Sequence, residues 1–493
     1  MSGSFWRSVH ALAAARRPAF HMPGHGQRRP GGTVALPEEV YALDQSEMAG
    51  LDYLHAPTAE LAASQARAAR VFGADRTWYL VNGATVGNLA ALWAVARPGG
   101  RALVMRRSHQ SVHAAATLAG LEPVYLQPVP DARTQGLCGL DLDQLRTALA
   151  QVEDVVCVHV TSPDYHGYRL PLAQIAALCA AAGVPLVVDE AHGAHLSFVE
   201  GEEGALAAGA DLVVQSPHKA LGSLTQSALL HQRGNRVDPD RVAEALVLLQ
   251  SSSPSALLTM SLDAVVEDLE RSGARTWTAQ ARLARDAATR LGPDGRPLLS
   301  PRLPLPHGVS ALDPCKLLVD CARYGRTPQQ VRAALEQVGV RPEFADQSSL
   351  VLSVTTGTTA ADVDVLLDAL GALAATAPAR EDGAASTLAL WPDRPAERRL
   401  PAREALQAAR ALVPLEDAAG AVVVAALTPY PPGVPLVLPG EVLSPSLVRT
   451  VQAFLRAGVA VRGLGTDEDG LPRVRCVLDV LDVPLPGRTA LSA

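Results

Sequence analysis

Residues 184–195 read VPLVVDEAHGAH, and residues 212–219 read LVVQSPHK. Each segment opens with a short run of branched aliphatic residues and then turns abruptly to acidic, basic and small residues. Such buried runs separated by helical periodicity predict an α/β fold whose parallel sheet is covered on both faces. Functional residues of such sheets lie beyond the carboxyl ends of the strands. Further strands of this kind are predicted at 77–81, 102–105, 123–126 and 155–160.

Composition excludes several classes of protein. The chain has 493 residues, 48% of them apolar and 19% charged, which excludes a disordered chain or a coiled coil. The net charge of −7, without a long basic run, argues against nucleic acid as a partner. Apolar stretches such as 418–427 are too short to span a bilayer. Six cysteines without CxxC pairs argue against a disulfide framework and predict a reducing, cytoplasmic location.

The pattern divides the chain into several units. Residues 5–17 predict a helical arm rather than a transit peptide. We expect five segments, at 1–60 (arm and first motifs), 61–291 (large domain), 292–375 (small α/β domain), 376–402 (linker rich in Pro, Ala and Arg) and 403–493 (C-terminal α+β domain).

Lysine is almost absent from the sequence. Lysine and arginine together number 43, but only Lys219 and Lys316 are lysines. Arginine cannot replace lysine where an amine must lose its proton and act as a nucleophile, so a catalytic amine has two candidates. Codon bias is the alternative explanation. Lys219 follows a predicted strand, whereas Lys316 begins a strand of the small domain and is expected to form a structural ion pair.

Other chemistry-bearing residues follow the ends of the large-domain strands. Asn82-Gly83-Ala84-Thr85 opens a helix whose N-terminus suits an anion such as phosphate, although Asn-Gly turns are common. His109 is expected to stack on a planar ligand or to cap a helix. Asp189 ends a buried strand and either meets a cation or is satisfied by backbone donors. His192 and His195 lack the spacing of a zinc motif and an evident third ligand, so no metal is expected.

These residues together suit one cofactor. Pyridoxal 5′-phosphate (PLP) requires an amine for its aldehyde, a carboxylate for its ring nitrogen, a phosphate site and a stacking partner. Lys219, Asp189 and His109 supply the amine, the carboxylate and the stacking ring. Residues 83–85 with Ser216 supply the phosphate site. The sequence therefore predicts a PLP enzyme.

The same segments carry a family resemblance. The chain resembles the short forms of the ornithine/lysine/arginine decarboxylases, PLP-dependent enzymes of the aspartate aminotransferase-like fold. The resemblance covers most of the chain outside the linker and the last 30 or so residues. It rests on FHMPGH (20–25), DQSEMAGLDYLH (44–55), VNGATVGN (81–88), RSHQSV (107–112), DEAHGAH (189–195), SPHKALGSLTQ (216–226), QSSSPSALLTMSLD (250–263) and PYPPGVPLVLPGE (429–441).

The resemblance implies roles for individual residues. It makes Lys219 the Schiff-base lysine, Asp189 the partner of the pyridinium nitrogen and His109 the stacking group. It also places His192 beside Asp189, and it surrounds the phosphate with Ala84, Thr85, Ser216 and His218. Two positions depart from the family pattern: Gly26, where the family usually has lysine, and Asp164 in the loop TSPDYHG (161–167).

The implied reaction is decarboxylation of a basic amino acid to its amine and CO2, with arginine favoured over lysine or ornithine. Lys219 or His218 would return a proton to the substrate, and Glu441 would bind its distal cation unless it is an ordinary turn carboxylate. The alternatives are transamination, retro-aldol cleavage, a catalytically silent regulatory homologue and a metal-dependent hydrolase. The resemblance also predicts a homodimer or higher homo-oligomer, in which residues 251–255 help to complete the partner's site.

Overall fold

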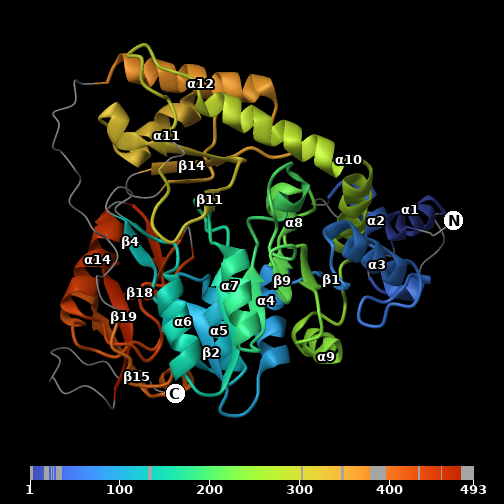
Figure 1. Cartoon of the computed structure of the whole chain (residues 1–493), viewed down its shortest axis with the longest axis horizontal. Helices are drawn as coiled ribbons and strands as arrows, with labels where there is room; N and C mark the ends of the chain where they lie inside the picture. Colours follow the sequence, from blue (N-terminus) through green and yellow to red (C-terminus); the bar gives the residue numbers. More distant parts are fainter. Residues whose placement is uncertain are drawn as a thin grey trace.

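The computed structural model describes residues 4–15, 21–23, 25, 27–28, 36–131, 136–300, 304–345, 349–377, 396–430, 433–456 and 458–478. Figure 1 shows the small domain above the central sheet of the large domain, and the C-terminal domain beside that sheet on the side opposite the N-terminal helices.

The large domain is built on a seven-stranded sheet. Its strands, in spatial order, are β1 (Arg76–Leu80), β10 (Ala228–Gln232), β9 (Leu212–Gln215), β8 (Leu186–Asp189), β6 (Val155–Thr161), β2 (Arg101–Met105) and β3 (Glu122–Leu126). Only β10 runs antiparallel to its neighbours. The mainly parallel sheet is therefore confirmed, and β10 is the strand that the sequence analysis missed.

Helices cover both faces of this sheet. Val187 and Val214 point to the face covered by α4 (Gly83–Val95), α5 (Gln110–Leu118) and α9 (Pro239–Leu249). Val188 and Val213 point to the opposite face, which is covered by α3 (Glu60–Phe72), α6 (Leu142–Gln151), α7 (Leu172–Ala181) and α10 (Ala256–Ala288). Because adjacent strand residues point to opposite faces, the unbroken aliphatic runs are buried on both sides as predicted.

Gly87 explains how closely α4 approaches the sheet. A Cβ atom at this position would lie 2.6 Å from Val214 Cγ1 and 3.0 Å from Leu80 Cδ1. This contact fixes α4, whose first residues follow β1, against the carboxyl edge of the sheet.

The small domain contains an antiparallel sheet of β12 (Lys316–Asp320), β14 (Ser349–Ser353) and β13 (Phe344–Ala345), with α11 (Pro328–Gln337) and α12 (Ala360–Ala375). The sequence predicts strands at 315–319 and 349–354 and helices at 328–338 and 360–375, and the observed bounds agree to within one residue. Its apolar residues join the same core as α10, so the large and small domains are continuously packed. The domain boundaries drawn from the sequence stay predictions.

The C-terminal domain has its own core. It combines α13 (Ala402–Gln407) and α14 (Pro445–Arg456) with strands β15 (Arg410–Pro414), β16 (Thr428–Tyr430), β17 (Ala460–Arg462), β18 (Leu464–Thr466) and β19 (Pro472–Val477). The expected α+β unit is confirmed.

The N-terminal arm is the helix α1 (Phe5–Ala15), which packs on α10. Trp6 Nε1 donates a hydrogen bond to Glu267 Oε2 over 2.8 Å. All six cysteines lie in the described residues, are buried and form no disulfide. Within the described ranges, no helix is both long enough and apolar enough to cross a membrane.

Candidate active site

The carboxyl edge of the sheet brings the predicted residues together. Asp189 is the last residue of β8, and Ser216 follows β9 at the N-terminus of α8 (Pro217–Ala220). Gly83 begins α4 after β1, and His109 precedes α5 after β2. These strands share one direction, so their ends meet at the same edge.

Asp189 is buried and has two hydrogen bonds but no cationic partner among the described residues. Its Oδ1 accepts from the Ala191 amide at 3.1 Å, and its Oδ2 accepts from Asn88 Nδ2 at 3.0 Å. Of the two possibilities considered for Asp189, a cation or backbone donors, one backbone amide is found, and the second donor is a side chain. The carboxylate remains available to compensate a positive charge in the site.

Asn88 connects Asp189 to His109. Its Nδ2 also donates to Ser111 Oγ at 3.0 Å, and Ser111 Oγ lies 2.8 Å from His109 Nδ1. Sequence reasoning did not assign Asn88 or Ser111. Both lie within the quoted motifs VNGATVGN and RSHQSV, which were the available signal.

His109 caps a helix, which is one of the two roles considered for it, and its stacking on a ligand stays a prediction. Its Nδ1 accepts a hydrogen bond from the Ser111 amide at 3.2 Å and so caps α5, while the ring lies at the site. Burial lowers its pKa, and the nearby Asp189 partly opposes this shift. Gly433 of the C-terminal domain covers the ring: a Cβ at Gly433 would lie 3.1 Å from His109 Cδ2.

Lys219 and His192 are in direct contact. Lys219 Nζ lies 3.0 Å from His192 Nε2. Lys219 is exposed as a whole residue, but burial of its amine lowers the pKa of that amine, and Asp189 and Glu343 partly oppose the shift. Burial also lowers the pKa of His192 well below its ordinary value, assisted by Lys219 and Lys316.

His218 and the residues expected to bind the phosphate also lie at the carboxyl edge of the sheet. His218 Nδ1 donates to the Ser227 carbonyl at 2.7 Å, and burial lowers the pKa of this ring. Ser216 is buried, and its hydroxyl has no hydrogen-bond partner among the described residues. At the first turn of α4, Gly83 has φ +73°, Ala84 is half-buried and Thr85 is exposed.

Glu441 lies in a charged contact between domains. Its side chain is buried, and its Oε2 receives Arg106 Nη2 at 3.0 Å and the Leu438 amide at 2.7 Å. Arg106 directly follows β2 and also donates to two carbonyls of the C-terminal domain. These contacts favour the structural alternative for Glu441. Its role toward a substrate stays a prediction.

Lys316 forms the ion pair expected from the sequence, but close to the site. Its Nζ lies 2.7 Å from Glu343 Oε2 and 2.6 Å from Ser353 Oγ. Glu343 Oε1 in turn lies 3.9 Å from His192 Nδ1. Sequence reasoning missed Glu343, for which no strand-end pattern gave a signal.

The two histidines of DEAHGAH are directed to different partners. His195 Nε2 lies 2.9 Å from Asp313 Oδ1, and the ring packs on Trp277. Potential ligand atoms of His195, Asp313 and Cys315 lie within 4.8 Å of one another, a grouping that the sequence spacing did not reveal. His192 faces Lys219, so the two histidines do not form a metal pair with each other.

Three further predictions concern Gly26, Asp164 and the segment 251–255. Gly26 lies outside the described residues. Asp164 accepts hydrogen bonds from the amides of His166 and Tyr168, at 3.0 and 2.9 Å, and so organises the loop that carries Tyr165. The Ser251 amide donates to Asn82 Oδ1 at 3.0 Å, which places the exposed segment 251–253 beside the start of α4.

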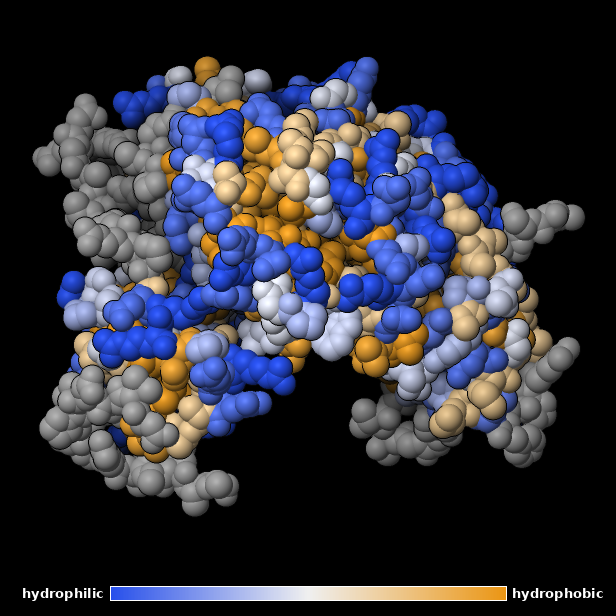
Figure 2. Space-filling view, turned by 60° about the horizontal axis from the view of Figure 1, so that its bottom comes forward, coloured by the Kyte–Doolittle hydropathy of each residue, from blue (hydrophilic) through white to orange (hydrophobic). Residues whose placement is uncertain are grey.

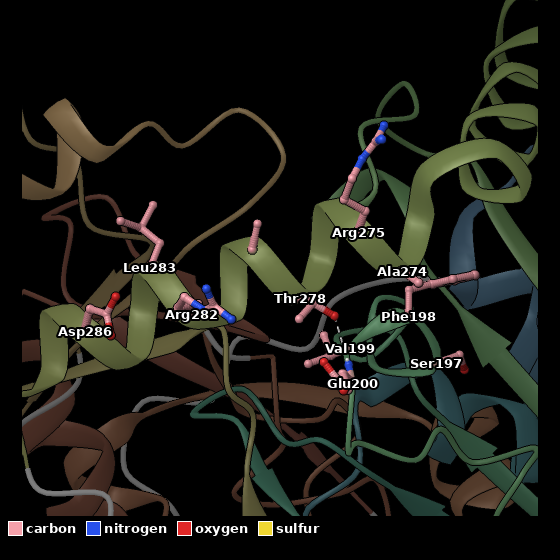
Figure 3. Close-up of a pocket in the computed structure, with 11 residues that line it drawn as sticks. Ser197, Phe198, Val199, Glu200, Ala274, Arg275, Thr278, Arg282, Leu283 and Asp286 are labelled. Atoms are coloured by element: carbon pink, nitrogen blue, oxygen red, sulfur yellow. Dashed lines mark hydrogen bonds between the residues drawn. The ribbon is translucent and has the colours of Figure 1, made fainter.

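A surface cavity of about 800 Å³ lies elsewhere, between the 3₁₀ turn η2 (Leu196–Phe198) and α10. Figure 3 shows Thr278 of α10 beside Glu200, whose amide donates to Thr278 Oγ1 at 3.1 Å, and Arg282 one turn further along the helix. None of the residues predicted for the active site lines this cavity.

Comparison with known families identifies the chain. The model of the Orn/Lys/Arg decarboxylase major domain matches residues 4–292, and that of the C-terminal domain matches residues 395–473. The chain belongs to the Orn/Lys/Arg decarboxylase family. It is therefore a PLP-dependent carboxy-lyase acting on amino acids, and the resemblance drawn from its motifs is confirmed.

Relatives of the family match the chain over most of its length. The chain is 31% identical to "Arginine decarboxylase" of Bacillus subtilis (strain 168), over 91% of this chain and 93% of that protein. It is 30% identical to "Arginine decarboxylase" of Bacillus anthracis, over 90% and 91% of the two chains. Lysine decarboxylase A from Pseudomonas aeruginosa has the same fold, with a TM-score of 0.79 and 20% identity over 96% of this chain and 80% of that chain.

Proposed function

We propose that this decarboxylase converts arginine to its amine and CO2, with Lys219 and Asp189 as its central residues. The observation that carries the choice of substrate is the match, over about nine-tenths of both chains, to two relatives named as arginine decarboxylases. Lysine and ornithine remain the other substrates to be compared.

The described residues fit PLP. The Ser216 hydroxyl, which is buried and without a hydrogen-bond partner in the described part of the chain, and the N-terminus of the 13-residue helix α4 suit its phosphate. His109 offers a ring at the same edge, and Asp189 offers a buried carboxylate without a cationic partner in the described ranges. Bound PLP supplies a protonated ring that accepts the electrons left behind when CO2 departs.

The chain's own residues then have distinct tasks. Asp189 keeps the proton on the ring nitrogen, because removing that proton would leave a buried carboxylate without a positive partner. Lys219 would hold the cofactor through its side-chain amine. His218 uses its Nδ1 proton for the Ser227 carbonyl and has a lowered pKa, so its Nε2 carries no proton at neutral pH. We therefore favour Lys219 over His218 as the donor that returns a proton to the substrate.

The proposal is tested by CO2 release. Purified protein with added PLP is given arginine, lysine or ornithine at equal concentrations. Arginine is expected to give the highest kcat/KM. A higher kcat/KM with lysine or ornithine would contradict the proposed substrate, and release from none of the three would contradict the proposed reaction.

We further propose that the protein acts in the cytoplasm as a homodimer or higher homo-oligomer, with residues 251–255 completing the partner's site. Trp93, Val247 and Leu248 are exposed apolar residues on the adjoining helices α4 and α9. Figure 2 shows hydrophobic residues gathered in the middle of one face, between hydrophilic ones. Closed two-fold assemblies are the commonest among soluble oligomers.

Mixing tests this assembly. A Lys219→Ala chain and a chain altered in 251–255, each inactive alone, are expected to regain partial activity as heterodimers. A fully active monomer in sedimentation, or proven heterodimers without activity, would contradict the shared site.

A further inference from the structure

Three side chains form a line from the large domain to the small domain. Lys219 Nζ lies 3.0 Å from His192 Nε2, and His192 Nδ1 on the other side of the ring lies 3.9 Å from Glu343 Oε1. An amine nucleophile, an imidazole within hydrogen-bond reach and a third group facing the other ring nitrogen are the usual signature of an activated nucleophile.

Glu343 is fixed by the chain's second lysine. Its Oε2 is engaged by Lys316 Nζ at 2.7 Å and by the Ser353 hydroxyl. The Lys316 side chain is only 5% exposed, whereas that of Glu343 is 27% exposed. One carboxylate oxygen is therefore held by the small domain while the other faces His192. Both lysines of this lysine-poor chain thus lie at the two ends of one charged cluster.

His192 is held in place on its other sides. Its ring meets Tyr165 edge-on, with centroids 4.7 Å apart, and Tyr165 meets Phe344 in the same way at 5.0 Å. The next residue, Gly193, has no room for a side chain, because a Cβ there would lie 2.6 Å from Pro163 Cδ. The imidazole therefore has little freedom to turn away from Lys219.

We propose that His192 is the base that takes a proton from Lys219 when the protein loads PLP, and that Glu343 is a positioning residue that keeps the other imidazole proton on Nδ1. The inference rests on the proposed PLP chemistry and deepens it. The Lys219 ammonium gives one proton to His192 Nε2, and the freed lone pair forms a bond to the aldehyde carbon. The aldehyde oxygen leaves as water with the two remaining protons of the amine, and no atom is oxidised or reduced.

Two pKa shifts bear on this proton transfer: the lowered pKa of His192 keeps Nε2 unprotonated but makes it a weaker base, and the lowered pKa of Lys219 makes the ammonium a stronger acid. Burial lowers the pKa of His192, so its Nε2 is free to accept at neutral pH. The Lys219 ammonium is one cause of that lowering, together with Lys316, His109 and His218, and the Lys219 contribution ends once the proton has moved. Burial and Lys316 lower the pKa of Lys219, while Asp189 and Glu343 oppose this shift.

The test measures cofactor loading rather than turnover. PLP is added to cofactor-free protein, and the rise of the lysine-dependent visible absorbance is followed by rapid mixing from pH 6 to pH 9. His192→Ala is expected to slow this rise at least tenfold near pH 7, with rates approaching the wild type at high pH, where Lys219 loses its proton to water. Added imidazole is expected to restore part of the lost rate.

Glu343→Gln is expected to slow loading severalfold near pH 7, with a rate that approaches the wild type at high pH, while Glu343→Asp retains most of the rate. Glu336→Gln, on α11 of the same small domain, is the matched control and is expected to leave the profile unchanged. If Glu343→Gln does not fold, Lys316→Met, which removes the amine that holds Glu343 Oε2, is expected to slow loading near pH 7 as well.

The outcomes separate the two proposals. A wild type without lysine-dependent absorbance would overturn both the PLP chemistry and this inference. A wild type that loads PLP, with profiles of the folded His192→Ala and Glu343→Gln variants that superimpose on its own, would overturn this inference alone.

Discussion

The sheet of the large domain and the two outer domains each bring a carboxylate toward the same sheet edge, but these carboxylates differ in whether they are paired with a cation. Asp189, at the end of β8, is buried with two neutral donors and no cation among the described residues. Glu441 of the C-terminal domain is paired with Arg106, and Glu343 of the small domain is paired with Lys316. The Glu441–Arg106 pair joins two domains and the Glu343–Lys316 pair lies within the small domain, whereas the charge of Asp189 is available to a bound cofactor.

The largest effect is expected at the lysines. Lys219→Ala removes the amine and should abolish both turnover and the cofactor's visible absorbance. Lys316→Arg keeps the charge beside Glu343 and should leave both largely intact. Absorbance spectra and CO2 release measure the two properties together. If the effects of the two substitutions were reversed, the sheet edge would not be the cofactor site.

Asp189→Asn tests the unpaired carboxylate directly. The substitution keeps the shape and removes the charge, so decarboxylation is expected to fall by orders of magnitude while thermal unfolding changes little. Initial rates at saturating PLP measure the loss of decarboxylation, and a melting curve measures the change in thermal unfolding. Near-normal turnover would mean that this carboxylate does not hold the ring proton.

Removing the charge of a paired carboxylate should affect stability, in contrast to Asp189, whose charge should matter mainly for activity. Glu441→Gln leaves the buried Arg106 without its counter-charge and is expected to lower the free energy of unfolding by about 3 kcal/mol. It should leave the rate of cofactor loading unchanged. Glu343→Gln should destabilise less, because Glu343 is partly exposed, and should slow loading. Urea unfolding and loading kinetics are measured on both variants. Equal losses of unfolding free energy together with equal loading rates would contradict the comparison.

The sheet itself should respond to acid. Burial lowers the pKa of His159 to about 4, from an ordinary value of 6.5. The neutral ring is therefore favoured in the folded state, and its contribution to stability is complete above pH 6.5 and is lost as the pH falls toward 4. His159→Gln should flatten the fall in unfolding free energy over this window. An unchanged slope would show that other groups cause it.

The sequence predicts the sheet edge well for a physical reason. Parallel strands end at one edge, so Asp189, Ser216 and Lys219 could be placed together from strand order alone. β10 was missed because its apolar run is short and ends in two polar residues, His231 and Gln232. Both are buried, where His231 Nδ1 pairs with Thr77 Oγ1 and Gln232 Nε2 donates to the Val237 carbonyl.

Contributions from other domains could not be predicted in the same way. The contact of Glu343 with His192 depends on how the small domain packs against a loop about 150 residues earlier in the chain. The burial of Glu441 depends in the same way on Arg106. Neither pairing has a local pattern, because the partners meet only after the domains have packed.

The scarcity of lysine makes the central claim directly measurable. The PLP-loaded protein can be reduced with borohydride, digested and analysed by mass spectrometry, which locates the lysine that carries the cofactor. With only Lys219 and Lys316 in the chain, the result distinguishes two positions. We expect the reduced cofactor on Lys219. Finding it on Lys316, or on neither lysine, would contradict the assignment of the sheet edge as the active site.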